Sequence, residues 1–207
     1  PDLQQDHQLV GAWKGKRLVG YAHYRILENS FHLNQLVVHP AYQGRGIGRC
    51  LVEEWKKRAE DLGQYMLSLD VSEKNRRSYD WYCTMGFEPV SRTYIYQCKA
   101  TKFKSQLAEK TKADDKICVL KWEETAAWYR AFRIANIQLK YQNHIWKIGW
   151  IHKALFLKEE LPNALVPILF HLTQGAKWLF LLCSGPLQNF SGIWSLTDIL
   201  VRMEKRL

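Results

Sequence analysis

A glycine-rich loop, His39-Pro-Ala-Tyr-Gln-Gly-Arg-Gly-Ile-Gly48, is the feature that most limits the folds open to this chain. The apolar run Leu33–Val38 precedes the loop, and the amphipathic run Arg49–Leu62 follows it. A strand, a loop and a helix in this order direct several backbone N–H groups toward one concave spot at the start of the helix. Such a spot suits a phosphate or pyrophosphate group. The sequence therefore predicts an α/β protein that binds a phosphorylated ligand.

The loop differs from the two common phosphate-binding motifs. No Lys-Ser or Lys-Thr pair follows the glycines, as a P-loop requires, and their spacing is not that of a dinucleotide fingerprint. Gly46 and Gly48 would let the backbone approach a ligand closely, and Arg45 and Arg49 would add positive charge. On the loop alone, a turn that only joins strand to helix remains the alternative.

The segments after the loop continue an α/β pattern. Apolar residues at helical spacing predict a helix that ends at Gly63, and Tyr65–Val71 reads as a strand. A second helix is predicted to begin at Asn75, a good N-cap residue, and to end at Gly86. Phe87 then begins the next strand.

Three elements in this order resemble the GNAT superfamily of acetyl-CoA-dependent N-acetyltransferases, over roughly Leu9 to Gln97. The first is the apolar strand that ends in Val38-His39-Pro40, and the second is a Q-x-x-G-x-G loop. The third is an N-x-x-S-x-x-x-Y-x-x-x-G-F segment. The loop pattern is filled by Gln43, Gly46 and Gly48, and the later segment by Asn75, Ser78, Tyr82, Gly86 and Phe87. Each element is weak evidence alone, but all three in order form a strong signal.

The resemblance implies acetyl-CoA as the cofactor and assigns a role to each matching position. The strand before the loop would offer backbone groups to the pantetheine arm, and Asn75 would contact the same arm. The loop would cradle the pyrophosphate. These roles fall on Leu36, Val37 and Val38 for the strand, and on Gln43, Gly44, Arg45, Gly46, Ile47, Gly48 and Arg49 for the loop.

The resemblance also suggests catalytic residues. Tyr82 would lie near the thioester sulfur and donate a proton to the leaving thiolate, although a half-buried structural tyrosine is the alternative. Some family members carry a glutamate six residues before the last valine of the strand, and His32 occupies that position here. A histidine can act as a base near neutral pH. A surface histidine is an equal alternative, and Glu28 or a relay of waters could serve instead.

The segment before the loop reads as a β-hairpin, Leu9–Lys14 and Arg17–Ile26 around Gly15-Lys16, which matches two strands of the family. The family's first strand and first two helices should precede this hairpin, but only eight residues do. Either the sequence is truncated or the protein departs from the family. Those elements form one wall of the acceptor site, so the acceptor is less certain than the cofactor.

Composition favours a cytosolic protein without a membrane span. The apolar runs are too short to cross a bilayer, and there is no signal-peptide pattern. Five cysteines without C-x-x-C spacing predict reduced thiols and no metal site.

Most of the positive charge lies in the second half of the chain. Up to Cys98 there are 13 basic and 11 acidic residues, and from Lys99 onward there are 17 and 9. Six of the nine tryptophans also lie in this half. Basic and aromatic residues together can bind nucleic acid, but the charges are dispersed and no binding motif is present, so nucleic acid is a disfavoured partner. The tryptophans are better explained as core.

The second half repeats the order of the first. A hairpin is predicted at Ile134–Tyr141 and Ile145–Ile151, followed by a strand at Lys153–Leu157, a helix at Leu161–Leu172 and strands at Lys177–Cys183 and Ser195–Leu207. No Q-x-x-G-x-G loop precedes its helix. We therefore predict a degenerate GNAT-like half without its own cofactor site, which could be structural or could supply an acceptor wall. An unrelated α/β extension is the alternative.

The predicted fold is a mixed, mostly antiparallel sheet flanked by helices, as a possible tandem of GNAT-like halves. We expect a GNAT domain at 1–98, a basic linker at 99–120 and the degenerate domain at 121–207. The expected activity is direct transfer of acetyl from acetyl-CoA to a primary amine in a ternary complex, with a small molecule or a peptide as the acceptor. A non-catalytic acyl-CoA sensor or interaction module is the second hypothesis.

Overall fold

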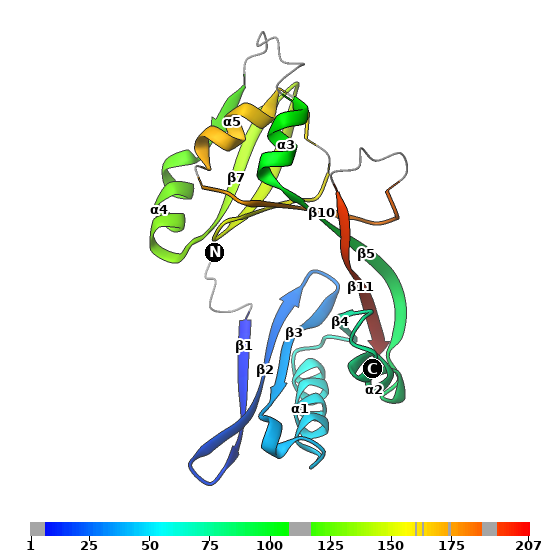
Figure 1. The fold of residues 1–207 in the computed structure, drawn as a ribbon. Coiled ribbons are helices and arrows are strands. Elements are labelled where there is room, and N and C mark those ends of the chain that lie inside the picture. Colours follow the sequence, from blue (N-terminus) through cyan, green and yellow to red (C-terminus); the bar gives the residue numbers. More distant parts are fainter. Residues whose placement is uncertain (1–6, 108–116, 160, 163, 174, 188–193) are drawn as a thin grey trace. The chain divides into compact units, whose positions relative to one another are not determined.

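The structure, a computed structural model, describes residues 7–107, 117–159, 161–162, 164–173, 175–187 and 194–207. It divides into two compact units (Figure 1). Unit 1 comprises Pro1–Arg92 together with Leu200–Leu207, and unit 2 comprises Thr93–Ile199. The predicted boundaries after residues 98 and 120 follow chain order, whereas the units do not, because the last eight residues of the chain belong to unit 1.

Unit 1 contains the hairpin, the glycine loop and the two helices predicted around it. Its elements are β1 (His7–Lys14), β2 (Arg17–Leu27), β3 (Ser30–Val38), the short 3-10 helix η1 (Pro40–Tyr42), α1 (Ile47–Asp61), β4 (Met66–Ser72) and α2 (Arg76–Thr84). The strand β5 (Glu88–Lys99) begins in this unit and continues into unit 2. Each predicted element of this half is present, with ends that differ by a few residues.

Unit 2 follows the predicted order from its hairpin onward. Its elements are α3 (Ala100–Leu107), β6 (Cys118–Leu120), α4 (Trp122–Phe132), β7 (Ile134–Tyr141), β8 (His144–Ile151), β9 (Ala154–Leu157), α5 (Leu165–Leu172) and β10 (Trp178–Cys183). The last strand, β11 (Ser195–Arg206), begins in unit 2 and continues into unit 1 from Leu200. The range 99–120, predicted as a linker, contains α3 and β6, while residues 108–116 lie outside the described residues. Helix α4 was not predicted.

The sheet is mixed and mostly antiparallel, as predicted. In unit 1 the strand order is β1-β2-β3-β4-β11, and in unit 2 it is β5-β10-β9-β8-β7-β6. Among the described strands, two pairs are parallel, β3 with β4 and β9 with β10. In each case one helix, α1 or α5, connects the two parallel strands, as a crossover requires. The two units thus share one arrangement of hairpin, helix and returning strand.

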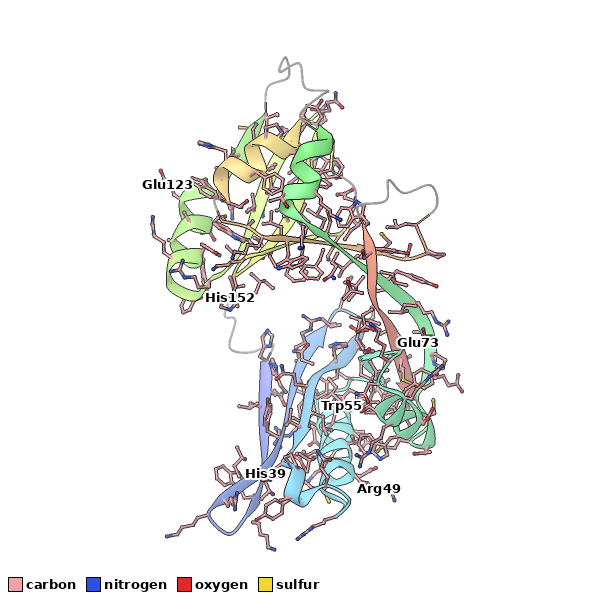
Figure 2. All side chains as sticks on the ribbon, in the orientation of Figure 1. His39, Arg49, Trp55, Glu73, Glu123 and His152 are labelled. Atoms are coloured by element: carbon pink, nitrogen blue, oxygen red, sulfur yellow. The ribbon has the colours of Figure 1, made fainter. Side chains whose placement is uncertain are left out.

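Each unit has its own apolar core. In unit 1, helix α1 packs its apolar stripe on the sheet, and Trp55 of this stripe, labelled in Figure 2, is fully buried between Tyr24 and Phe87. In unit 2 the core is formed by β7 to β10 and α5. Of the tryptophans predicted to fill a core, Trp150 is buried, but Trp128 on α4 is 46% exposed.

Candidate functional site

The parallel strands β3 and β4 separate after three paired positions. Phe31, His32 and Leu33 pair with Leu67, Ser68 and Leu69, and no further pair between these strands occurs in the described residues although β3 continues to Val38. The separation coincides with a bulge. His23 of β2 pairs with Gln35, and its neighbour Tyr24 pairs with Leu33, so Asn34 is an extra residue in β3. The bulge bends β3, and the backbone of its last residues is left facing the gap.

The glycine loop leads from this strand end into α1. Gly46 is the residue before the helix and has φ +83°, a conformation that favours glycine. A Cβ at Gly44 or Gly46 would meet no atom within 4 Å, so the loop faces open space at both positions. The N–H groups that open α1 have no partner within the helix and are available to an anion. Arg49, labelled in Figure 2, adds a positive charge in the first turn of the helix.

Helix α2 forms the opposite wall. The side chain of Asn75 caps it by accepting a hydrogen bond from the Ser78 N–H at 3.2 Å, as the N-cap prediction requires. Gly48 of α1 allows the two helices to approach, because a Cβ there would lie 3.3 Å from the Trp81 ring. The absence of a side chain at Gly48 therefore permits the close approach of the two walls.

A cavity of about 720 Å³ lies between β3, the loop and α2. Its volume is within the ordinary range for small-molecule sites. It brings together most of the positions predicted to bind the cofactor, namely Leu36, Val38, Gln43, Gly44, Gly46, Ile47, Gly48, Arg49 and Asn75. The open face of the glycines and the unpartnered N–H groups fit a diphosphate, and the cavity extends from them along the end of β3.

Two predicted positions do not line the cavity. Val37 is 44% exposed on β3, between the two lining residues Leu36 and Val38, as the alternation of a strand requires. The Arg45 guanidinium lies 5.4 Å from the centre of the Tyr42 ring. Gln43 lines the cavity, but its side-chain amide also donates to the Val38 carbonyl at 3.1 Å, which ties the loop to the strand end.

Four lining residues were not predicted as ligand contacts: Tyr42, Arg77, Ser78 and Trp81. The sequence carried a signal for one of them. Ser78 belongs to the N-x-x-S pattern of α2, and Arg77 lies one residue before it. Tyr42 precedes the loop glutamine, and only the fold shows that this residue lines the cavity.

Tyr82 is buried, with 8% of its surface exposed, and its ring packs against Trp81 and Phe87. Burial raises the pKa of its hydroxyl from the ordinary value near 10 to about 12. The residue does not line the cavity itself but lies next to Trp81, which does.

His32 lies deeper than a surface histidine. It is 3% exposed, and its Nδ1 is 3.0 Å from the Ser68 hydroxyl, which in turn is 2.7 Å from the Ser30 hydroxyl. Its Nε2 lies 3.8 Å from an Asp70 carboxylate oxygen. Burial lowers its pKa to about 4, against the opposing effect of Asp70, so the imidazole is neutral at pH 7. Like Tyr82, it does not line the cavity.

Other kinds of site receive no support from the described part of the chain. No group of three or more His, Cys, Asp or Glu side chains lies close enough there to hold a metal ion. No described helix is long and apolar enough to cross a membrane.

Comparison with known proteins relates the first part of the chain to one family. A model of the acetyltransferase (GNAT) family matches residues 2–87. The chain is 38% identical over 85 residues to the N-alpha-acetyltransferase RimI of Mycobacterium tuberculosis, covering 39% of this chain and 52% of that protein. It is 28% identical over 93 residues to the thialysine N-epsilon-acetyltransferase of Bos taurus, and this match covers 42% of this chain and 55% of that protein. The chain thus spans about half the length of these relatives.

Among solved structures, a tandem GNAT protein from the clavulanic acid biosynthesis pathway matches 97% of this chain and 83% of its own, with a TM-score of 0.68 and 12% identity. A probable N-acyltransferase from Enterococcus faecalis V583 matches 99% of this chain and 63% of its own, with a TM-score of 0.60 and 12% identity. At these identities the likeness concerns the fold, and it includes the second half of the chain. Residues 2–87 of this chain therefore match the acetyltransferase (GNAT) family, and the chain as a whole has the fold of a tandem GNAT protein.

Proposed function

We propose that this chain transfers the acetyl group of acetyl-CoA to a primary amine by direct attack in a ternary complex. The observation that carries the proposal is the cavity between the separated strand β3 and helix α2, closed at one end by the glycine loop and the start of α1. The two relatives named above are, by their names, acetyltransferases of α- and ε-amines. The acceptor we propose is accordingly an amine of a small molecule or a peptide.

The proposed contacts follow the cavity from end to end. The loop from Gln43 to Arg49 would hold the pyrophosphate, because it combines glycines that face open space with the first N–H groups of a helix. The end of β3, Leu36 to Val38, and Asn75 would hold the pantetheine arm. When bound, acetyl-CoA supplies an acetyl group activated as a thioester.

In this reaction the amine nitrogen bonds to the acetyl carbon and the carbon–sulfur bond breaks. The thiolate needs a proton, and we assign its delivery to Tyr82, whose hydroxyl is protonated at neutral pH, as that of any ordinary tyrosine is. Burial raises its pKa further, to about 12. Tyr82 does not line the cavity but contacts the ring of Trp81, which does, so a small movement of α2 or one bridging water would have to complete this contact.

The amine must lose a proton, and we propose His32 as the group that receives it. Its imidazole is neutral at pH 7, so one ring nitrogen carries a lone pair that can accept a proton, although the lowered pKa makes it a weaker base than an ordinary histidine. Since His32 is buried and outside the cavity wall, the proton would reach it through a relay of water. Glu28, exposed in the turn between β2 and β3, is the other candidate base.

The test is release of free CoA thiol with a panel of amines, measured beside the binding of acetyl-CoA alone. Amine-dependent thiol release supports the transferase. Saturable binding of acetyl-CoA without thiol release for any amine would favour a non-catalytic acyl-CoA sensor. Absence of acetyl-CoA binding would contradict both the transferase and the sensor hypotheses.

A further inference from the structure

Three cationic side chains gather around one tyrosine at the edge of the cavity. The Lys14 ammonium lies 5.7 Å from the centre of the Tyr42 ring, the Arg17 guanidinium 5.7 Å and the Arg45 guanidinium 5.4 Å. Lys14 ends β1 and Arg17 begins β2, where the two residues pair across the hairpin. Arg45 comes from the glycine loop. Two segments of the chain therefore bring their charges to the same ring, and we call these three side chains and Tyr42 the Tyr42 cluster.

The charge of the Tyr42 cluster is not neutralised. None of its three cations has a carboxylate within ion-pair distance in the described residues, whereas Lys56 and Arg58 on α1 pair with Glu53 and Glu54. Like charges held this close repel each other, and the face of the Tyr42 ring offsets only part of that repulsion. A concentration of unpaired positive charge at the end of a cavity is therefore suited to an anion.

The Tyr42 cluster is continuous with the proposed cofactor cavity. Tyr42 lines the cavity together with Arg49 of α1 and Arg77 of α2, which add two further cations to the cavity lining. The amide concavity of residues 43–49 accounts for one anionic group. The cations on the β1–β2 hairpin lie outside that concavity, so they would meet a second anion on the same ligand.

We propose that the Tyr42 cluster binds the 3′-phosphate of coenzyme A. This inference rests on the proposed function, which places the diphosphate of the ligand at the neighbouring loop. A phosphate monoester carries close to two negative charges at neutral pH, and guanidinium groups bind such oxygens with two parallel hydrogen bonds. Lys14 and Arg17 thereby make the site selective for coenzyme A thioesters over thioesters that lack the 3′-phosphate.

The experiment compares acetyl-CoA with 3′-dephospho-acetyl-CoA by titration calorimetry on the full chain. The wild type should bind acetyl-CoA at least about tenfold more tightly, since charge-assisted contacts of this kind contribute at least that factor. Arg17→Ala and Lys14→Ala should each remove most of this affinity ratio, because they should weaken the binding of acetyl-CoA and leave the binding of 3′-dephospho-acetyl-CoA unchanged. Lys16→Ala is the matched control, because Lys16 lies in the hairpin turn between them and makes no described contact with Tyr42.

The outcomes separate the two proposals. Equal affinity of the wild type for both thioesters would overturn the 3′-phosphate site and leave the transferase proposal standing. A ratio that persists in both Arg17→Ala and Lys14→Ala would also overturn it. Failure of the folded wild type to bind either thioester would instead contradict the proposed function. Circular dichroism of each variant establishes that folding is intact.

Discussion

Arg202 forms a two-point ion pair with Asp70, with its Nε 2.6 Å from one carboxylate oxygen and its Nη2 2.9 Å from the other. The two residues are 132 positions apart in sequence but directly paired between β11 and β4. The contact shows that the end of the chain is a structural part of unit 1. Asp70 is also the carboxylate that faces His32, so the same ion pair borders the proposed base.

The last strand supports the site through two further contacts. The Lys205 ammonium donates to the Met85 carbonyl at 2.8 Å, at the end of α2, and the Leu207 N–H donates to the Tyr65 carbonyl. Val201 and Met203 are fully buried in the core of unit 1. The helix that carries Asn75 is therefore held at its other end by the chain terminus.

We expect Met203→Ala to destabilise the protein by about 2–4 kcal/mol, because it removes a fully buried side chain from the core of unit 1. Leu196→Ala, on the same strand but at a residue 51% exposed, should cost less than about 1 kcal/mol. Urea denaturation monitored by tryptophan fluorescence measures both. Equal effects would show that the half of β11 in unit 1 is not packed as described.

Local sequence patterns predicted most helices and strands, because the residues at the ends of each element indicate where it begins or stops. Gly15, Gly63 and Gly86 occupy turns or helix ends with positive φ, and Asn75 caps its helix. The strand Ser195–Leu207 was predicted, but its partner β4 was not, because no local pattern encodes a pairing across so long a sequence separation. Helix α4 was missed because its exposed Trp128 and Phe132 obscure an amphipathic pattern.

The sequence predicted the cavity positions whose place depends on backbone geometry that a motif requires. It predicted less well the positions at which side chains from different elements meet. The motif located Gly46 and Asn75 at the cavity, since their roles depend on a turn and on a helix cap. The sequence did not reveal that His32 is buried against Ser68, or that Lys14 and Arg17 both lie over the Tyr42 ring. These contacts depend on which strands become neighbours and how they bend.

Gly46→Asp should weaken acetyl-CoA binding by at least about tenfold, because it places a carboxylate at the start of α1 where the diphosphate is proposed to lie. Gly63→Asp is the matched control. It has a similar positive φ, +67° against +83°, and lies at the other end of α1. Both variants should therefore lose similar stability, and only the first should lose affinity in calorimetry. Parallel loss of affinity in both would argue against the loop as the phosphate site.

Tyr82→Phe should lower kcat by about a hundredfold with little change in acetyl-CoA affinity, since it removes the proposed proton donor and keeps the packed ring. Tyr79→Phe removes a hydroxyl from the same helix without touching that donor, and its kcat should remain near the wild-type value. Steady-state thiol release measures kcat, and calorimetry measures affinity. An unchanged kcat in Tyr82→Phe would exclude this residue from the mechanism.

The buried His32 predicts that acid destabilises the protein. Its pKa is about 4 in the folded state against 6.5 for an ordinary histidine, so between these values the unfolded chain binds a proton that the folded chain does not. Its contribution to stability is complete above pH 6.5 and decreases as the pH falls toward 4, by at most about 3 kcal/mol.

His32→Gln should flatten this part of the stability profile between pH 7 and pH 5. His171→Gln, which removes an exposed histidine from α5, should leave the wild-type profile unchanged. Denaturant midpoints measured across the pH range give the comparison. Identical profiles for wild type and His32→Gln would show that His32 is not buried as a neutral group.

The central claim is that one coenzyme A thioester site lies at the glycine loop of unit 1, and titration of the full chain with acetyl-CoA tests it most directly. We predict saturable binding of one acetyl-CoA per chain, because the loop before α1 has glycines and an open face, whereas no glycine occurs between β9 and α5. Two equivalents per chain would show a second site in unit 2. No heat of binding at millimolar acetyl-CoA, from a protein shown to be folded, would contradict the account.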